Sequence, residues 1–219
     1  MSFVLMKVLE SAPHRYDKGM KILTLGKIGK EYDALTEDIK ENDTVLDIGC
    51  GTGLLTIRAA LKGALVTAID INPEMLEIAN KRIQELEKDT SVSFLEMGVA
   101  ELDAFEESSF DIIMSGLCFS ELSTDEITYA LVQISRILRE NGLFLLADEM
   151  KSKSFLKRRV NWFIRIPLVI ISYIVTQTTS KTLKNIEEQV TAAGMTIKFR
   201  KTNFLENFVR LKIINGVKK

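Results

Sequence analysis

Apolar residues form short continuous runs that alternate with stretches of helical spacing along most of the chain. Five apolar runs predict buried strands, at 44–48, 65–70, 92–96, 110–115 and 143–148. Between them, the helical period recurs at 53–62, 73–88 and 124–140. Residues 1–40 also have a helical pattern. Strands that alternate with helices favour a parallel sheet with right-handed crossovers, so the pattern predicts an α/β fold with helices on both faces.

The end of the chain follows a different pattern. A helix is expected at 182–193, and after Gly194 the segments 195–201 and 208–214 are typical of a hairpin-like pair of strands. No internal repeat or low-complexity linker interrupts the 219 residues. A single domain is therefore expected, which is an ordinary size for one hydrophobic core.

A glycine-rich loop follows the first predicted strand, with Gly49, Gly51 and Gly53 at alternate positions. Glycine permits left-handed backbone and close approach of a ligand, and the following helix start offers free N–H groups. The spacing differs from G-x-G-x-x-G, and Leu54 stands where a P-loop has lysine. Asp47 would repel a pyrophosphate but suits an ammonium group. The loop therefore favours S-adenosylmethionine; a strand-to-helix turn without a ligand is the alternative.

A second acidic residue, Asp70, ends the second predicted strand. It lies about 20 residues beyond the glycine loop, where a carboxylate can accept hydrogen bonds from both ribose hydroxyls. Pro73 then begins a helix whose inner face carries Met75. Taken alone, Asp70 could be merely a helix cap. Together with the glycine loop, it predicts a ribose-binding carboxylate.

The glycine loop and Asp70 are followed by three further blocks, at 94–102, 110–117 and 137–147. Together, in this order, they resemble class I S-adenosylmethionine-dependent methyltransferases. The subgroup is the one similar to quinone-biosynthesis and small-molecule enzymes. The resemblance covers residues 40–150. It implies a Rossmann-like seven-stranded sheet, mostly parallel with one antiparallel strand, plus a helical cap. It implies that the cofactor, and its product S-adenosylhomocysteine, contact Tyr16, Asp47, Gly49, Cys50, Gly51, Gly53, Asp70, Ile71, Met75, Val99, Ala100, Glu101, Ser115 and Leu117.

The same resemblance divides residues 1–219, as one methyltransferase domain, into four parts. These are an N-terminal helical lid at 1–40, a cofactor-binding core at 41–150, a basic and apolar helical cap at 151–181, and a C-terminal helix and strand pair at 182–219. In relatives, a tyrosine of the leading helices reaches the methionine part of the cofactor. Tyr16 is the preferred candidate for this role, and Tyr32 is the alternative.

Two positions depart from the family pattern. Val99 stands where an acid usually holds the adenine amino group, which leaves Glu101 or a backbone carbonyl as the alternative partner. The segment 118–122 lacks the histidines that many relatives carry there. A general base is therefore unassigned, with His14, Glu121, Asp148 and Glu149 as candidates. An acceptor that is already nucleophilic, such as a metal(I) corrinoid or a thiolate, would need no base.

The resemblance leaves the acceptor open. Residues 11–17 and 116–122 are weakly similar to methyltransferases found beside corrinoid proteins, which would imply a corrinoid-linked acceptor or partner. In-line methyl transfer to a small molecule or a corrinoid-linked acceptor is expected, and a lipid or quinone at a membrane surface is the alternative acceptor. A noncatalytic protein that binds S-adenosylmethionine also fits the motifs, whereas a nicotinamide oxidoreductase is disfavoured by the glycine spacing. No aromatic-basic module for nucleic acid is present.

Charge is unevenly distributed along the chain. Residues 1–150 carry 14 basic and 27 acidic side chains, and residues 151–219 carry 15 basic and 3 acidic ones. Either the two parts attract each other, or the basic part meets an anionic partner. Residues 151–175 combine a basic cluster with an apolar run too short to span a bilayer. They are expected to form a cap over the pocket, or to dock on an anionic membrane or an acidic protein.

Composition adds little beyond compartment and metal content. Two cysteines lack metal-ligand spacing and His14 is the only histidine, so no metal site is expected. The start of the chain does not resemble a signal peptide. A cytoplasmic enzyme is therefore predicted, with peripheral attachment to the membrane as the alternative.

Overall fold

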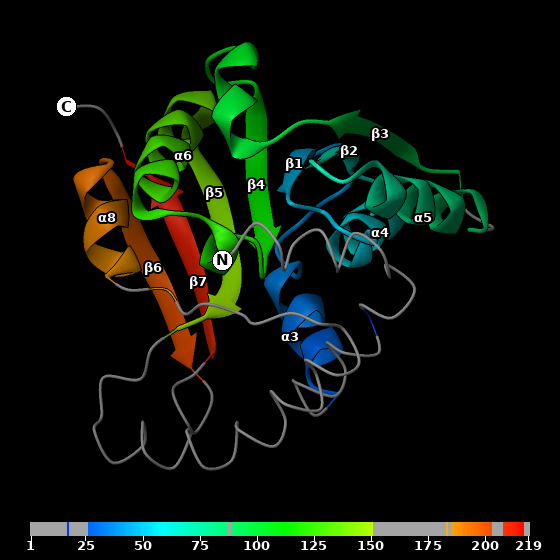
Figure 1. Ribbon diagram of the computed structural model, residues 1–219, viewed down its shortest axis with the longest axis horizontal. Helices are drawn as coiled ribbons and strands as arrows, with labels where there is room; N and C mark the ends of the chain where they lie inside the picture. The colour runs from blue at the N-terminus through cyan, green and yellow to red at the C-terminus, as the bar shows by residue number, and fades with distance from the viewer. Residues whose placement is uncertain are drawn as a thin grey trace.

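The computed structural model describes residues 17, 26–86, 89–150, 183, 185–202 and 208–216. Its centre is a seven-stranded sheet in the order β3-β2-β1-β4-β5-β7-β6 (Figure 1). The strands are β1 (Thr44–Ile48), β2 (Leu65–Asp70), β3 (Ser91–Glu96), β4 (Phe110–Gly116), β5 (Leu138–Glu149), β6 (Met195–Thr202) and β7 (Phe208–Asn215). Only β7 among them runs antiparallel to its neighbours, β5 and β6. The predicted mostly parallel sheet with one antiparallel strand is confirmed.

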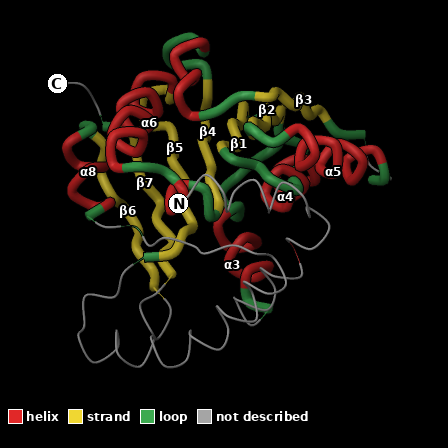
Figure 2. Tube along the Cα trace, viewed as in Figure 1, coloured by secondary structure: helices red, strands yellow, loops and turns green. Residues whose placement is uncertain are grey.

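Helices cover both faces of this sheet (Figure 2). On one face lie α3 (Ile28–Leu35), α4 (Leu54–Leu61) and α5 (Pro73–Gln84). On the other lie α6 (Thr124–Ile137), α8 (Ile186–Ala192) and the 3-10 helix η1 (Val99–Ala104); a shorter 3-10 helix, η2 (Phe119–Glu121), follows β4. Because side chains alternate along a strand, each central strand contributes to two cores. The central strands β1, β4 and β5 are thus buried on both sides.

The alternation is visible in β1, β4 and β5. Val45, Ile112 and Leu145 pack with α3 and α4, whereas the next residue of each strand packs with α6. Within β4 the residues from Ile112 to Ser115 are all buried, which explains the unbroken apolar run read from the sequence. β2, β1 and β4 are neighbours in the sheet, and their carboxyl ends position the site.

The boundary between α6 and β5 differs from the prediction of a helix to residue 140. The helix ends at Ile137, and β5 begins at Leu138 with a register irregularity before Ile112 pairs with Leu143. The Asn215 side chain explains the early end. Its Nδ2 donates to the carbonyl oxygens of Ser135 at 2.9 Å and Leu138 at 3.0 Å. A residue from the far end of the chain therefore satisfies carbonyls that a longer helix would use.

Two other helices are shorter than predicted. The helix α5 ends at Gln84 rather than about residue 88, because the Leu86 N–H bonds Ile83 O and tightens the last turn; residues 87–88 lie outside the described part. The predicted helix at 182–193 begins only at Ile186. Leu183 instead forms a parallel bridge with Met150, and its N–H donates to Glu149 O at 2.9 Å.

Part of the predicted domain organisation cannot be followed in space. Of the N-terminal lid, residue 17 and residues 26–40 are described, and α3 confirms helix there. His14, Tyr16 and the predicted cap at 151–181 lie outside the described residues. Within the described part, none of the helices combines the length and apolar character needed to cross a bilayer.

Candidate functional site

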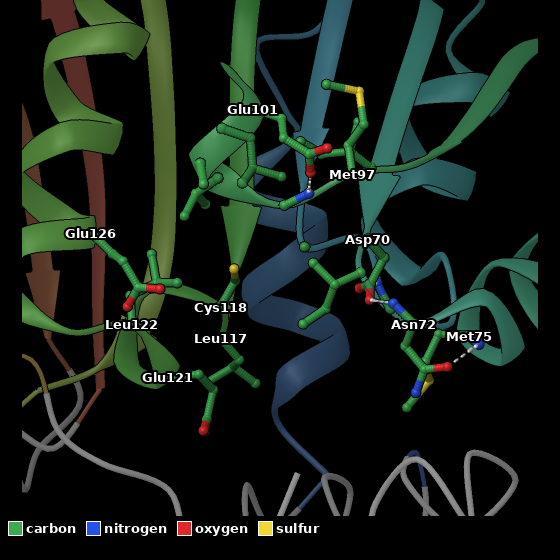
Figure 3. Close-up of a pocket in the computed structure, with 18 of the residues that line it drawn as sticks. Asp70, Asn72, Met75, Met97, Glu101, Leu117, Cys118, Glu121, Leu122 and Glu126 are labelled. Carbon is green, nitrogen blue, oxygen red and sulfur yellow. Dashed lines mark hydrogen bonds between the residues drawn. The ribbon is translucent and has the colours of Figure 1, made fainter. Parts of the chain in front are cut away.

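A cavity of about 420 Å³ opens at the carboxyl ends of β1, β2 and β4. The chain turns to one side of β1 through β2 and β3 and then returns to its other side at β4, which makes this a topological switch point where α/β sheets bind ligands. Figure 3 shows Asp70, Asn72 and Met75 along one wall, with Leu117, Glu121 and Leu122 facing them. The lining comes from four loops that follow strands.

The glycine-rich loop forms the floor of this cavity. Gly49, Gly51 and Gly53 have φ values of 68°, 51° and 81°, the left-handed region that favours glycine. The N–H groups of Gly49 and Cys50 both donate to Ile69 O, at 2.9 and 3.0 Å, and this anchors the loop to the end of β2. Gly49 and Gly51 line the cavity. The glycine spacing read from the sequence is therefore a backbone requirement.

Asp70 joins the glycine loop to the loop after β2. Its Oδ2 accepts a hydrogen bond from Gly51 N at 2.8 Å, and its Oδ1 accepts one from Asn72 N at 2.9 Å. Burial raises the pKa of this carboxyl, while these N–H donors oppose the rise. Asn72 is the residue that caps α5, through its own Oδ1. Asp70 is thus not the helix cap of the alternative interpretation; it lines the cavity.

Asp47 lies beneath the loop and does not reach the cavity wall. Its side chain is fully buried, and Oδ2 accepts a hydrogen bond from Thr56 Oγ1 at 2.6 Å. The other oxygen, Oδ1, is buried with no hydrogen-bond partner in the described part of the chain. Burial raises the pKa of Asp47 to about 7. A buried acceptor with an unused oxygen fits a ligand that brings a cationic donor, directly or through water.

The predicted adenine wall is formed by η1 and the residues before it. Met97, Gly98, Val99, Ala100 and Glu101 line the cavity together. The Gly98 N–H donates to Glu101 Oε2 at 2.8 Å, so this carboxylate caps the start of η1. Val99 is nearly buried. Glu101 is therefore on the predicted wall, with one of its oxygens already engaged by its own loop.

The end of β4 supplies the opposite wall. Gly116, Leu117 and Cys118 line the cavity, and Leu117 has a φ of 61°. Ser115 is buried behind them and donates through Oγ to Ile48 O at 2.9 Å. Gly116 packs against the buried ring of Tyr32, the alternative tyrosine candidate, so this tyrosine supports the wall from behind.

Of the three predicted base candidates within the described residues, one lines the cavity. Glu121 does so, next to Leu122 and Glu126. Asp148 is fully buried behind this wall, where its two oxygens accept hydrogen bonds from Ser120 N at 3.0 Å and Glu149 N at 2.6 Å. Burial raises the pKa of Asp148 to about 7. Asp148 and Glu149 are absent from the cavity wall, so their geometry indicates a structural role.

A polar cluster that the sequence reading missed holds the glycine loop from outside. Thr52 Oγ1 donates to Asp17 Oδ1 at 2.8 Å, and Arg82 donates to Thr52 O at 2.9 Å. Arg82 and Asp17 also form an ion pair. Three distant parts of the chain meet here, and no local motif indicates it. We call Asp17, Thr52 and Arg82 the loop clamp.

The structure thus brings most of the predicted cofactor residues to one cavity. They are Gly49, Gly51, Asp70, Ile71, Met75, Val99, Ala100, Glu101 and Leu117. Asp47, Cys50, Gly53 and Ser115 support the wall without lining it. The sequence reading missed Asn72, Met97, Gly98, Gly116, Leu122 and Glu126 as lining residues. Within the described residues, no group of three His, Cys, Asp or Glu side chains gathers as a metal ion would need.

Comparisons with known proteins agree with this geometry. Residues 45–142 match the family model described as a methyltransferase domain. The chain is 33% identical over 149 residues to the ubiquinone/menaquinone biosynthesis C-methyltransferase of Nitrobacter hamburgensis, covering 64% of this chain and 58% of that protein. It is 34% identical over 151 residues to a demethylmenaquinone methyltransferase of Leptospira interrogans, covering 58% and 59%.

The chain therefore spans less than two thirds of the length of these curated relatives. Among solved structures, a Methanosarcina mazei protein described as an S-adenosylmethionine-dependent methyltransferase superposes with a TM-score of 0.64 at 19% identity. The superposition covers 84% of this chain and 98% of that one. At this identity the likeness establishes the fold.

Proposed function

We propose that this chain, whose residues 45–142 form a class I S-adenosylmethionine-dependent methyltransferase domain, binds S-adenosylmethionine in the cavity above β1, β2 and β4 and catalyses transfer of its methyl group to an acceptor. The observation that carries the proposal is the Asp70 carboxylate, half-buried at the cavity edge and hydrogen-bonded to the glycine loop through Gly51 N. A carboxylate held in this way is preorganised to accept hydrogen bonds from ribose hydroxyls.

Three sets of residues would hold the cofactor. Asp70 would accept from the ribose, and Val99 with its neighbours would flank the adenine. Asp47 would receive the ammonium group through a bridging water, because its Oδ1 is buried below the cavity floor without a partner among the described residues. When bound, S-adenosylmethionine supplies an electrophilic methyl group on a sulfonium. The chain's own task is then to align the acceptor and exclude water.

The cavity wall formed by the loop after β4 favours an acceptor that is already nucleophilic. Leu117, Cys118 and Leu122 are apolar or weakly polar, and burial raises the pKa of the Cys118 thiol, which disfavours a thiolate there. Among the described base candidates, Glu121 is the one that lines the cavity. A metal(I) corrinoid or a thiolate acceptor needs no proton removed, and we propose such a corrinoid-linked or small-molecule acceptor first.

A reduced quinone is the second candidate acceptor. The relatives at 33% and 34% identity are named for quinone methylation, and the apolar side of the cavity would suit a flat aromatic ring. A quinone of this kind is dissolved in the membrane. We propose that residues 151–175 bring the chain to an anionic membrane surface or to an acidic partner protein. Glu121 would then have to accept the proton lost from the ring.

Calorimetry on the full chain tests the cofactor assignment. S-adenosylmethionine and S-adenosylhomocysteine should both bind, and Asp70→Ala should weaken binding by about 1–3 kcal/mol, the cost of losing buried polar partners. Glu96→Gln is a matched control, since Glu96 pairs in register with Asp70 but is exposed on the neighbouring strand. If wild type and Asp70→Ala bind S-adenosylmethionine with equal affinity, Asp70 does not bind the ribose.

Release of S-adenosylhomocysteine tests the reaction. The acceptor panel should contain cob(I)alamin, a small thiol and a reduced naphthoquinone, each with and without anionic vesicles. Turnover with the corrinoid or thiol supports the first acceptor class, and turnover with the quinone supports the second. Tight cofactor binding with no turnover on any acceptor would favour a noncatalytic S-adenosylmethionine-binding protein.

A further inference from the structure

The two edges of the sheet are built differently. At one edge, β6 carries exposed Lys198, Arg200 and Lys201 and has a register irregularity between Ile197 and Phe199. Edge lysines and bulges are devices that stop a sheet from pairing with other chains. At the other edge, β3 has neither lysine, arginine nor proline, and its register with β2 is regular over all six residues. Of the two edges, only β6 is guarded.

The outer side of β3 presents backbone groups for pairing. Met97 N donates to Asp70 O at 3.1 Å, which fixes the alternation of the strand. The amides of alternate residues therefore point to β2, and those of Val92, Phe94 and Glu96 point away from the sheet. No strand of the described part pairs with this outer side. Figure 1 shows β3 at the border of the sheet, beyond β2.

A groove lies beside this edge on the face that carries η1. It has a volume of about 380 Å³, and its floor includes Leu65, Thr67 and Ser93. Phe105 and Phe110, packed edge to face at 5.3 Å, form the far wall. Leu65 is 45% exposed and Leu95 is 38% exposed, so apolar surface on this face is open to a neighbour. A strand added at β3 could place alternate side chains over it.

The surroundings of the edge are acidic. Between residues 89 and 110 the chain has no lysine or arginine, and its exposed carboxylates there include Asp89, Glu96, Asp103, Glu106 and Glu107. Arg136 is a nearby cation, and it is occupied by the carbonyl oxygens of Leu102 and Phe105. Such a field attracts a basic segment. It opposes pairing with a second copy of β3, because the same carboxylates would then face each other.

We propose that the outer edge of β3 binds an extended, lysine- or arginine-bearing segment of a partner protein, which adds to the sheet as a further strand. Main-chain hydrogen bonds to Val92, Phe94 and Glu96 would supply affinity, and the acidic rim would supply preference for basic side chains. The site is separate from the cofactor cavity, since Val92 and Phe94 do not line that cavity.

Short synthetic peptides test this surface on the full chain. A peptide of alternating lysine and valine should bind, and binding should weaken as salt is raised. In hydrogen exchange, the amides of Val92, Phe94 and Glu96 should gain protection. The matching glutamate and valine peptide should bind at least about tenfold more weakly. Equal binding of the two peptides, or protection elsewhere only, would overturn the proposal.

Two variants locate the contact. Val92→Pro removes an outward N–H without removing a bond to β2, a position that tolerates proline at a sheet edge. Leu95→Lys adds a guarding charge with the backbone intact. Each should weaken the lysine peptide by about tenfold while affinity for S-adenosylhomocysteine is unchanged. Unweakened peptide binding in Leu95→Lys would contradict the proposal. So would a dimer in sedimentation that this variant dissociates, because the occupant would then be a second copy.

Discussion

The Cys118 side chain fills the space beside Gly49. A Cβ placed on Gly49 would overlap both Sγ and Cβ of Cys118, and the φ of Gly49 is already 68°. The glycine loop and the loop after β4 therefore meet at a point with room for a hydrogen atom only. This contact connects the floor of the cavity to the wall formed by the loop after β4.

Gly49→Ala should consequently destabilise the fold more than Gly51→Ala. Both residues have positive φ, so each alanine carries a left-handed backbone cost of about 1–2 kcal/mol. Only Gly49 adds a steric overlap, since a Cβ on Gly51 meets nothing within 4 Å. Urea unfolding of both variants measures the difference. Equal losses of stability would mean that the Cys118 loop moves aside freely.

Stability should fall as pH rises from about 4 to 7. Burial raises the pKa of Asp47 and of Asp148 to about 7, whereas an aspartate carboxyl in the unfolded chain has its ordinary pKa of 3.8. Between these values the folded state holds protons that the unfolded state has released. Each group then contributes a slope of up to about −1.4 kcal/mol per pH unit, which vanishes above pH 7. Asp47→Asn should flatten the slope of unfolding free energy over this range; an unchanged slope would contradict a buried protonated Asp47.

Cofactor affinity should also depend on the protonation of Asp47. The ionised form would hold an ammonium group, so affinity for S-adenosylhomocysteine should rise with pH until Asp47 is ionised near pH 7. Adenosine lacks the ammonium group and serves as a matched ligand control. Calorimetry at several pH values should show the dependence for the first ligand and not for the second. The same dependence for adenosine would assign the titration to another group.

Loss of the loop clamp should weaken cofactor binding more than it weakens the fold. Asp17→Ala removes the acceptor of the Thr52 hydroxyl and the partner of Arg82. We expect a stability loss of about 1 kcal/mol and a clearly lower affinity, because Thr52 lies between two glycines of the cavity floor. Glu187→Ala breaks an arginine–carboxylate ion pair with Arg200 between α8 and β6, at the edge of the sheet opposite β3, and is the control. Equal affinities in the two variants would exclude the clamp as a positioning device.

Both thiols should react slowly in the native protein. Burial raises the pKa of Cys50 and of Cys118 above the ordinary value, which leaves little thiolate at neutral pH. Labelling with iodoacetamide at pH 7.5 should therefore be much faster in denaturant than in buffer. S-adenosylhomocysteine should slow the labelling of Cys118 further, since that residue lines the cavity. Rapid native labelling would point to an exposed, activated cysteine.

The core of the fold can be predicted from the sequence because the local hydrophobic pattern and the burial of residues in the folded protein agree there. The strand before Gly49 is an apolar run buried on both faces, and the strand ending in Asp70 is buried at Val66, Ala68 and Ile69; the bounds of both match the prediction. The glycine spacing predicted a loop that the φ values confirm. Where the local pattern and the folded protein differ, prediction was less accurate. The end of α6 is set by Asn215, a residue some 80 positions away, which local periodicity does not report.

The site was predictable where a motif is contiguous and not where contacts are remote. Asp70 and Gly51 follow from spacing along the chain. Arg82 was not singled out, because its partners Asp17 and Thr52 are joined only by folding. Asp148, a base candidate from the sequence, does not line the cavity, for a related reason. A carboxylate at a strand end resembles a base in sequence, yet its two oxygens are used by Ser120 N and Glu149 N inside the protein.

The bridge between Met150 and Leu183 has an engineering consequence. The chain leaves the end of β5 and returns beside it, so the two junctions of the intervening segment are already adjacent. Exchanging that segment for its counterpart from a relative, or replacing it with a short glycine linker, requires no rerouting of the sheet. A variant with either exchange would keep the sheet and the cavity above β1, β2 and β4, so a change in its behaviour could be assigned to the exchanged segment.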